Sequence, residues 1–141
     1  MLFPSRDLDV TKADDQALVI QLVTPLARIL QVSDSGDSTE RELLKSPADL
    51  RSDILVKGQH VSGNSGSDEF LDAVQPRLII ATSCDFPERE RLPDAWVEKV
   101  RGRGIKLFRQ DETGAVELKF YRDSWEARSY ITGEIFRSSS R

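Results

Sequence analysis

Short apolar runs alternate with polar segments along the chain, at the lengths that strands and helices require. The runs 17–23 and 26–32 are rich in residues that favour strands and are separated by Pro25, which predicts a hairpin. The runs 53–57 and 76–83 are almost wholly apolar, which is typical of strands buried on both faces. The first part of the chain therefore predicts a sheet with buried central strands.

The polar segment after the first hairpin predicts a short helix. Asp37 and Glu40 have the three-residue spacing of a capping box, so we expect the helix to open at this point. Leu43 and Leu44 should both face the core, and Pro47 lies just past the expected end of the helix.

Two more helices are expected, one after each of the buried strands. Ser67 is placed to cap the first of them, and its first turn is acidic, which suits the helix dipole. Pro93 suits the first turn of the second helix, which should run to about Arg101. The apolar side chains expected to face the core are Phe70, Leu71, Val74, Ala95, Trp96 and Val100.

The last part of the chain predicts β structure. The segments 105–110 and 115–121 flank the turn sequence DETG and predict a second hairpin. The segment 125–136 predicts a further ribbon, and the last residues should fray. The order ββαβαβαββ, followed by this ribbon, predicts an α/β layered fold.

Composition narrows the class of protein. The chain has 141 residues, 38% hydrophobic and 31% charged, which fits one soluble globular domain. A net charge of −4 argues against binding nucleic acid through bulk charge. No apolar run approaches the roughly 20 residues of a membrane helix, and the N-terminus does not resemble a signal peptide. A single cysteine and a single histidine exclude an internal disulfide framework and a structural Cys/His zinc site.

Three polar loops, at 33–37, 58–66 and 82–88, each follow an apolar strand. Because ligand sites in α/β sheets collect beyond the carboxyl ends of strands, these loops are expected to share one rim. Asp34, in the first loop, could ligate a metal ion or orient a water molecule. On residue type alone, a turn aspartate that bonds its own backbone is the more common role.

The second and third loops hold the only histidine and the only cysteine. His60 could be a metal ligand, although a lone histidine is more often a structural or surface residue. Cys84 with His60 would suit a thiol hydrolase, but no local signature supports this and the cysteine can equally be a packing residue. A set of basic residues could touch phosphate or could line a solvated edge: Lys99, Arg101, Arg103, Lys106 and Arg109.

The order of these motifs resembles a known family over residues 1–120. LQVSDSGDSTERELL resembles the pattern LLTGDAE…E..LL, and DILVKGQHVSGNSGS resembles DVLKVGHHGSKTSS. Both patterns come from the second half of the metallo-β-lactamase-like domain in ComEC-type competence proteins, which take up DNA across a membrane. The resemblance places Asp34 at the metal-bridging aspartate, Gln59 and His60 at the paired histidines, and Ser62 at the serine.

The resemblance implies a fold and an activity. The fold would be the C-terminal half of an αββα sandwich, a mixed sheet with helices on one face, over residues 1–122, with a ribbon and tail over 123–141. The activity would be metal-dependent hydrolysis of a phosphodiester in DNA, with zinc or manganese in the complete domain. Asp34 would bridge two ions, His60 would ligate one or polarise a phosphate oxygen, and Ser62 and Asn64 would contact phosphate.

The chain also departs from the family pattern. Gln59 replaces the first histidine, Val61 replaces a glycine, and the segment RERLPDAWV lacks the family's downstream histidine. The HxHxDH motif of this fold belongs to the first half of the domain, which this sequence does not include. We therefore expect the chain alone to be inactive and to bind no catalytic metal tightly. The alternative is a degenerate, non-catalytic binding or structural module of a membrane DNA-uptake assembly.

Partners and location follow from the same resemblance. The expected partners are the N-terminal half of the domain, the membrane channel portion of the parent protein, and DNA. The chain would be a soluble domain of a bacterial inner-membrane protein, or cytoplasmic if expressed alone. Half of a sandwich should expose the sheet face that its partner covers, so we expect marginal stability or self-association.

Overall fold

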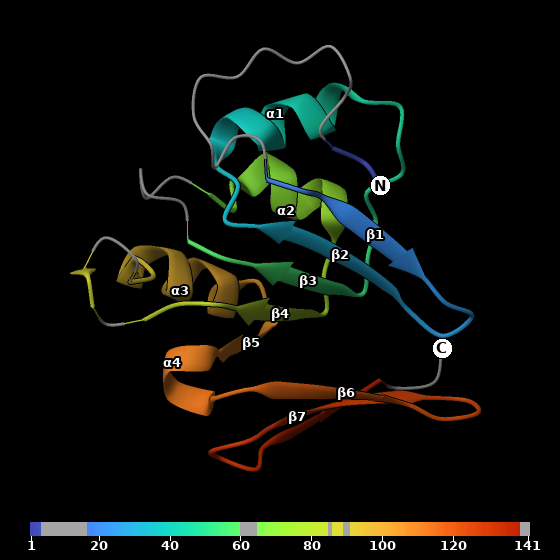
Figure 1. The fold of residues 1–141 in the computed structure, drawn as a ribbon, viewed down its shortest axis with the longest axis vertical. Coiled ribbons are helices and arrows are strands. Elements are labelled where there is room, and N and C mark those ends of the chain that lie inside the picture. The colour runs from blue at the N-terminus through green and yellow to red at the C-terminus, as the bar shows by residue number, and fades with distance from the viewer. Residues whose placement is uncertain (4–16, 60–64, 85, 89–90, 139–141) are drawn as a thin grey trace.

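The computed structural model describes residues 1–3, 17–59, 65–84, 86–88 and 91–138 (Figure 1). Within them, five strands form one sheet in chain order, with β1 antiparallel to β2 and the strands β2 to β5 all parallel. These strands are β1 (Ile20–Val23), β2 (Arg28–Ser33), β3 (Ile54–Lys57), β4 (Leu78–Ala81) and β5 (Lys106–Arg109). The predicted first hairpin and both buried strands are confirmed.

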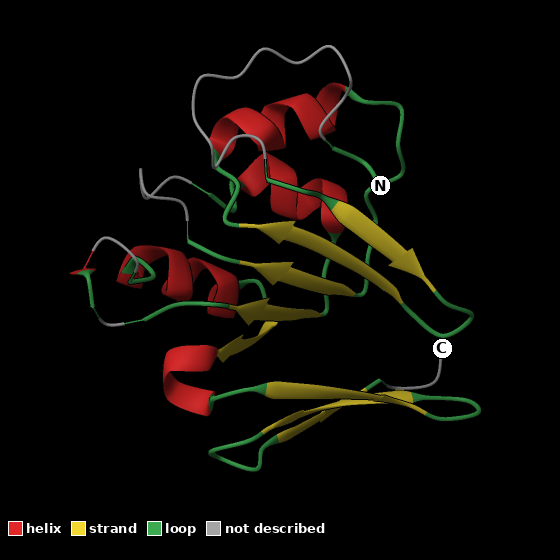
Figure 2. Cartoon of the chain, in the orientation of Figure 1, coloured by secondary structure: helices red, strands yellow, loops and turns green. Residues whose placement is uncertain are grey.

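Three helices connect the parallel strands and cover one face of this sheet (Figure 2). They are α1 (Asp37–Lys45), α2 (Asp68–Val74) and α3 (Asp94–Gly102). Their apolar side chains, among them Leu43, Phe70 and Val100, form one buried cluster with Leu55 and Ile79 of the sheet. The mixed α/β architecture with helices on one face is therefore confirmed.

The expected hairpin over 105–121 is wrong. The strand β5 pairs with β4, and residues Gln110–Thr113 form a single helical turn, α4, where a β-turn was predicted. The hydroxyl of Thr113 donates to the backbone oxygen of Arg109, and Gly114 at φ +69° then redirects the chain. The next strand, β6 (Val116–Phe120), consequently leaves the five-stranded sheet and pairs with β7.

The strands after α4 form a second sheet that covers the other face of the first. In this part of the chain, β6 is followed by β7 (Trp125–Ser129) and β8 (Ile135–Arg137), in an antiparallel three-stranded sheet. Trp125 and Ala127 pack against Ile54, Leu78 and Phe108 of the five-stranded sheet, and all five are at most 1% exposed. The prediction that this face would be exposed is therefore wrong for the described residues, and the fold has three layers.

Several local predictions can be compared with the structure. Ser67 caps α2 as predicted, by accepting a hydrogen bond from the backbone N–H of Phe70 at 3.2 Å. The capping box is wrong, because Gly36 is the N-cap of α1 and its helix start has no side-chain cap. The predicted inward positions of Leu44 and Ala95 are also wrong, since both side chains are exposed.

Across the residues described, the structure contains no helix that is long and apolar enough to cross a membrane.

Candidate functional site

The carboxyl ends of β2, β3 and β4 meet at Gly58. A Cβ atom on this residue would lie 3.0 Å from the Oγ1 atom of Thr82 and 3.2 Å from the Cα and Cβ atoms of Asp34. The backbone N–H of Gly58 donates to the oxygen of Ser33, and that of Thr82 donates to the oxygen of Lys57 at 2.8 Å. The described first residues of the three polar loops therefore share one rim, as predicted, and Gly58 permits their close approach because it lacks a side chain.

Asp34 is placed on this rim by an unusual backbone conformation. Ser33 has φ +54°, at a register irregularity where β2 ends against β3. A positive φ is strained for a residue with a Cβ, and such strain clusters at functional sites. It turns the chain so that Asp34 is exposed at the strand end, next to Gly58.

A buried ion pair continues the rim at the ends of β4 and β5. The guanidinium of Arg109 lies 2.6 Å from one carboxylate oxygen of Asp111, and the Ser83 hydroxyl donates to the other at 2.5 Å. Burial raises the pKa of Asp111, but the hydrogen bonds from Arg109 and Ser83 outweigh it and hold that pKa below its ordinary value. The hydrogen bond between Ser83 and Asp111 connects the third loop to α4.

Sequence reasoning missed a cluster of buried polar side chains beneath the rim, on the helix side of the sheet. The carboxylate of Glu40 is 2% exposed and accepts hydrogen bonds from the backbone N–H groups of Gly66 and Ser67. The indole N–H of Trp96 donates to the backbone oxygen of Gly66 at 2.9 Å. Glu40 thus binds the backbone of a segment that is distant in the sequence, and it does not cap its own helix.

Lys57, the last residue of β3, belongs to the same cluster. Its side chain is 2% exposed, and its Nζ atom lies 4.5 Å from the ring centroid of Trp96. Burial lowers the pKa of Lys57 to about 8, and the negative charge of Glu40 acts in the opposite direction. A lysine at the end of an apolar run gave no sequence signal for this, since such a residue usually reaches solvent.

Several buried polar atoms in this region have no hydrogen-bond partner in the structure. They are Thr39 Oγ1, Lys57 Nζ, Gln59 Nε2 and Ser65 Oγ. Such atoms carry a free-energy cost unless water or another group satisfies them. They lie on α1, on the last residue of β3 and in the segments that flank the loop after β3.

The structure brings together only part of the predicted site. His60, Ser62 and Asn64 lie outside the described residues, so their roles as metal ligand and phosphate contacts stay predictions, as does the pairing of His60 with Cys84. Gln59, at the position of the family's first histidine, is 9% exposed. No three His, Cys, Asp or Glu side chains come together as a metal site among the residues that the structure describes.

The basic residues of α3 and β5 are engaged in ion pairs. Lys99 lies 3.5 Å from a carboxylate oxygen of Asp68, and Arg101 lies 3.2 Å from one of Glu98. Arg103 bonds Asp68 and Asp72, Lys106 bonds Glu134, and Arg109 bonds Asp111. These contacts favour the interpretation of this set as a charge-paired edge and not as a phosphate-binding patch.

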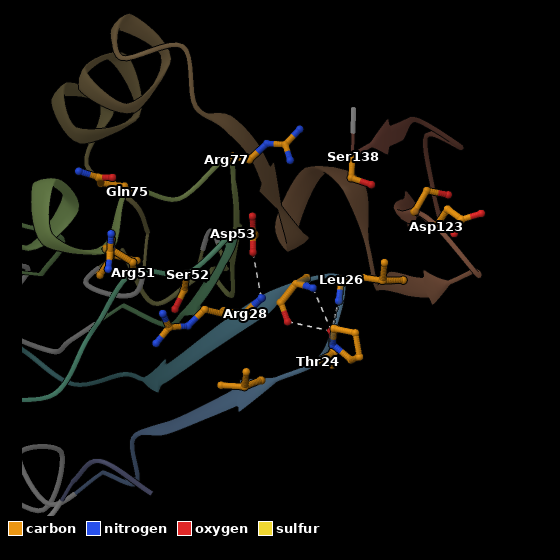
Figure 3. A pocket seen from close by; sticks show the side chains of 15 residues that line it. Thr24, Leu26, Arg28, Arg51, Ser52, Asp53, Gln75, Arg77, Asp123 and Ser138 are labelled. Atoms are coloured by element: carbon orange, nitrogen blue, oxygen red, sulfur yellow. Dashed lines mark hydrogen bonds between the residues drawn. The ribbon is translucent and has the colours of Figure 1, made fainter. Parts of the chain in front are cut away.

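A cleft of about 820 Å³ lies at the opposite, amino-terminal end of the parallel strands. Figure 3 shows Asp53 and Arg77 beside this cleft, across from Asp123 and Ser138. The backbone N–H of Arg28 donates to the carboxylate of Asp53 at 2.9 Å. The lining mixes acidic and basic side chains, so the cleft has no clear preference for a charged ligand.

Comparison with known proteins adds to this geometry. No protein-family model matches the chain. The chain is similar to a competence protein. Competence protein ComA of Neisseria gonorrhoeae is 32% identical to it over 114 residues, which cover 80% of this chain and 16% of ComA. ComE operon protein 3 of Bacillus subtilis is 20% identical over 112 residues, which cover 79% of this chain and 14% of that protein.

The chain thus spans less than a fifth of the length of either relative. The matches support the competence-protein part of the resemblance seen in the sequence. The metallo-β-lactamase-like domain remains a prediction.

Proposed function

We propose that this chain serves in DNA uptake, as the C-terminal part of a metallo-β-lactamase-like domain. Its similarity to Competence protein ComA supports the role in uptake. The observation that carries the proposal is the convergence of β2, β3 and β4 on Gly58, which sets the exposed carboxylate of Asp34 beside the start of the loop that carries His60. A rim of this kind is where α/β sheets bind their ligands.

The parent activity in this proposal is hydrolysis of a phosphodiester bond in DNA. Asp34 and His60 would provide two ligands of different chemistry, a carboxylate and an imidazole, for zinc or manganese. A divalent ion bound there would supply an activated water molecule and neutralise charge on the phosphate. Ser62 and Asn64 would donate hydrogen bonds to phosphate oxygens.

In this proposal the chain supplies part of a metal site, through Asp34 and His60. The remaining ligands would come from the N-terminal half of the domain, which is the first partner we propose. The others are the membrane channel portion of the parent protein and the DNA itself. The isolated chain is expected to be catalytically inactive for this reason.

A second candidate function is a non-catalytic module with the same fold. It is favoured by Gln59, which is buried at the position of a family histidine and whose Nε2 atom finds no partner in the structure. An amide is a weaker ligand for zinc than an imidazole, so this replacement should reduce metal affinity. In that case the rim would bind DNA or another part of the assembly without cleaving it.

Calorimetric titration of the complete domain, this chain together with the proposed N-terminal half, with Zn²⁺ and with Mn²⁺ separates the two candidates. The hydrolase proposal predicts micromolar binding that is lost in His60→Ala and in Asp34→Asn. Asp37→Asn is the matched control, because Asp37 begins α1 just after Asp34 but pairs with Arg41 at 2.8 Å. Binding by the complete domain that survives both site variants, or no binding by that domain, would refute a working metal site here and favour the non-catalytic module.

A further inference from the structure

The three-stranded sheet has an outer face that points away from the five-stranded sheet. Val116, Leu118 and Ala127 pack toward the five-stranded sheet, so the alternate side chains of β6 and β7 lie on the opposite face. The charged side chains on this outer face are Glu117 and Lys119 of β6, Glu126 and Arg128 of β7, and Arg137 of β8. All of them except Glu126 are exposed.

A tyrosine lies at each end of the outer face. The backbone N–H of Tyr121 donates to the oxygen of Ser124, and that of Tyr130 donates to the oxygen of Ala115, both at 2.8 Å. These bonds continue the pairing of β6 with β7 by one residue at either end, which places the two tyrosines about 20 Å apart along the strands. Tyr121 is 51% exposed and Tyr130 is 84% exposed.

The turn that carries Tyr130 is fixed by hydrogen bonds. The buried hydroxyl of Ser129 accepts the backbone N–H of Glu134 at 3.0 Å. The backbone N–H of Ile131 donates to the oxygen of Thr113, the last residue of α4, at 2.9 Å. Because a ring on a fixed turn loses little conformational entropy when it contacts a ligand, this arrangement favours a binding role for Tyr130.

The outer face also carries an unpaired positive charge. Lys119 lies 3.1 Å from a carboxylate oxygen of Glu117, and Arg137 lies 3.3 Å from one of Glu126. Arg128 forms no hydrogen bond or ion pair with any residue that the structure describes. The face therefore has a cation available between its two aromatic rings, although the chain as a whole has a net charge of −4.

The Tyr130 end of this face lies toward the proposed site. In Figure 1, α4 lies on the same side of the molecule as the arrowheads of β2, β3 and β4. The turn after β7 bonds α4 through Thr113, and Ser83 at the end of β4 bonds it through Asp111. A polymer that runs along the face from Tyr121 to Tyr130 therefore leads toward the end of the molecule that carries Asp34.

We propose that the outer face of β6, β7 and β8 binds single-stranded DNA, with bases stacked on Tyr121 and Tyr130 and a phosphate group bound by Arg128. One exposed tyrosine would need no explanation, but two rings with a free cation between them match the needs of an unpaired strand. Unpaired bases offer their flat faces to aromatic side chains, whereas the bases of a duplex are already stacked on each other. The inference rests on the proposed function in taking DNA as the ligand.

Fluorescence anisotropy tests the proposal with a labelled oligothymidine of about 15 nucleotides and the full chain, at low salt and without metal. Tyr121→Leu and Tyr130→Leu keep an apolar side chain without a flat ring, and each should weaken binding about tenfold. Tyr130→Phe keeps the ring and should bind as the parent chain does. Arg128→Gln should weaken binding and reduce by about one the slope of log affinity against log salt concentration. Arg101→Gln is the matched control, because Arg101 is an exposed cation on α3.

Three results would overturn the proposal. They are no binding of the oligothymidine, equal affinity for a duplex of the same length, and binding that Tyr130→Leu and Arg128→Gln leave unchanged. Vesicles of phosphatidylcholine and phosphatidylglycerol in equal parts provide a further comparison, and a chain that binds them but not the oligothymidine would have a membrane-binding face instead. Since no metal is present in these titrations, a failure of the proposed metal site would leave their result intact. Failure of the DNA-binding face would likewise leave the metal titration unaffected.

Discussion

The two ends of the parallel strands are both polar, but in different ways. At the amino-terminal end, Arg28 lies 2.6 Å from an Asp49 carboxylate oxygen, Arg51 bonds the same side chain, and the Arg51 and Asp49 side chains are well exposed. At the carboxyl-terminal end, Glu40 and Lys57 are buried, and the ammonium group of Lys57 finds no hydrogen-bond partner in the structure.

The two ends thus differ in whether their charged side chains are exposed to water or buried in the protein. Exposed ion pairs contribute little to stability, because water screens them and long side chains lose entropy in forming them. Buried charges carry a desolvation penalty of several kcal/mol per ion, which their interactions only partly offset. The buried charges at the carboxyl-terminal end therefore lower the free energy of unfolding. The sequence predicts the functional residues at this same end.

The largest expected effect comes from filling the space at Gly66. Gly66→Ala would place a Cβ 2.5 Å from Trp96 Nε1 at a positive φ, and we expect a loss of about 3 kcal/mol in the free energy of unfolding. Gly133→Ala is the control, because Gly133 has φ +66° but no atom within 4 Å of its Cβ position. It should cost about 1 kcal/mol by urea denaturation, and equal losses in the two variants would mean that packing against Trp96 is unimportant.

Lys57 should make stability depend on pH in the alkaline range. Its pKa is about 8 in the folded protein against an ordinary value of 10.5, so the unfolded chain binds more protons between these pH values. The free energy of unfolding should therefore rise by about 3 kcal/mol from pH 8 to pH 10.5. Lys57→Met should abolish this rise and be the more stable protein at pH 7. A less stable Lys57→Met protein at pH 7 would show that the charge stabilises the fold.

Glu40→Gln compared with Asp49→Asn tests the contrast between the two ends most directly. The buried variant leaves one backbone N–H at Gly66 or Ser67 without an acceptor, and we expect a loss of about 2 kcal/mol in the free energy of unfolding. The exposed variant should show no measurable change in the same urea titration. If Asp49→Asn is the more destabilised protein, the amino-terminal end is the structurally important one.

The smallest expected effect is at Ser33. Ser33→Gly should raise the free energy of unfolding by about 1 kcal/mol, because glycine adopts φ +54° without strain. Gln75→Gly is the control, at φ +52° in the left-handed cap of α2 and away from the rim. We expect equal stabilisation in thermal melts but weaker metal or DNA binding only in Ser33→Gly. Unchanged binding would show that Ser33 does not help to set the position of Asp34.

Much of the fold could be predicted because the signals were local. The apolar runs that became β3 and β4 have no other stable place than the interior of a sheet. Ser67 caps α2 through atoms only three residues apart. The hairpin predicted around DETG failed because turn chemistry alone does not say which strand is the partner. Pairing of β5 with β4 was decided by the sheet as a whole.

The residues of the candidate site likewise include some that local sequence could predict and some that it could not. Asp34 could be selected because it directly follows a buried strand, a feature that the sequence displays. Glu40 could not, because its spacing from Asp37 matches a capping box, whereas its actual partners are Gly66 and Ser67 on a later segment. Lys57 gave no signal, because burial of its charge depends on Trp96 of α3 covering the end of β3.

The sequence by itself determined where the strands and the three longer helices form, that they alternate, and that three polar loops follow apolar strands. Those properties follow from residue periodicity and from hydrogen bonds between near neighbours, which require no knowledge of the rest of the chain. Only the tertiary structure decided that the last three strands cover the second face of the sheet, and that Glu40, Lys57 and Trp96 meet beneath the rim. Burial and long-range contacts are properties of the whole packed chain, and no local pattern encodes them.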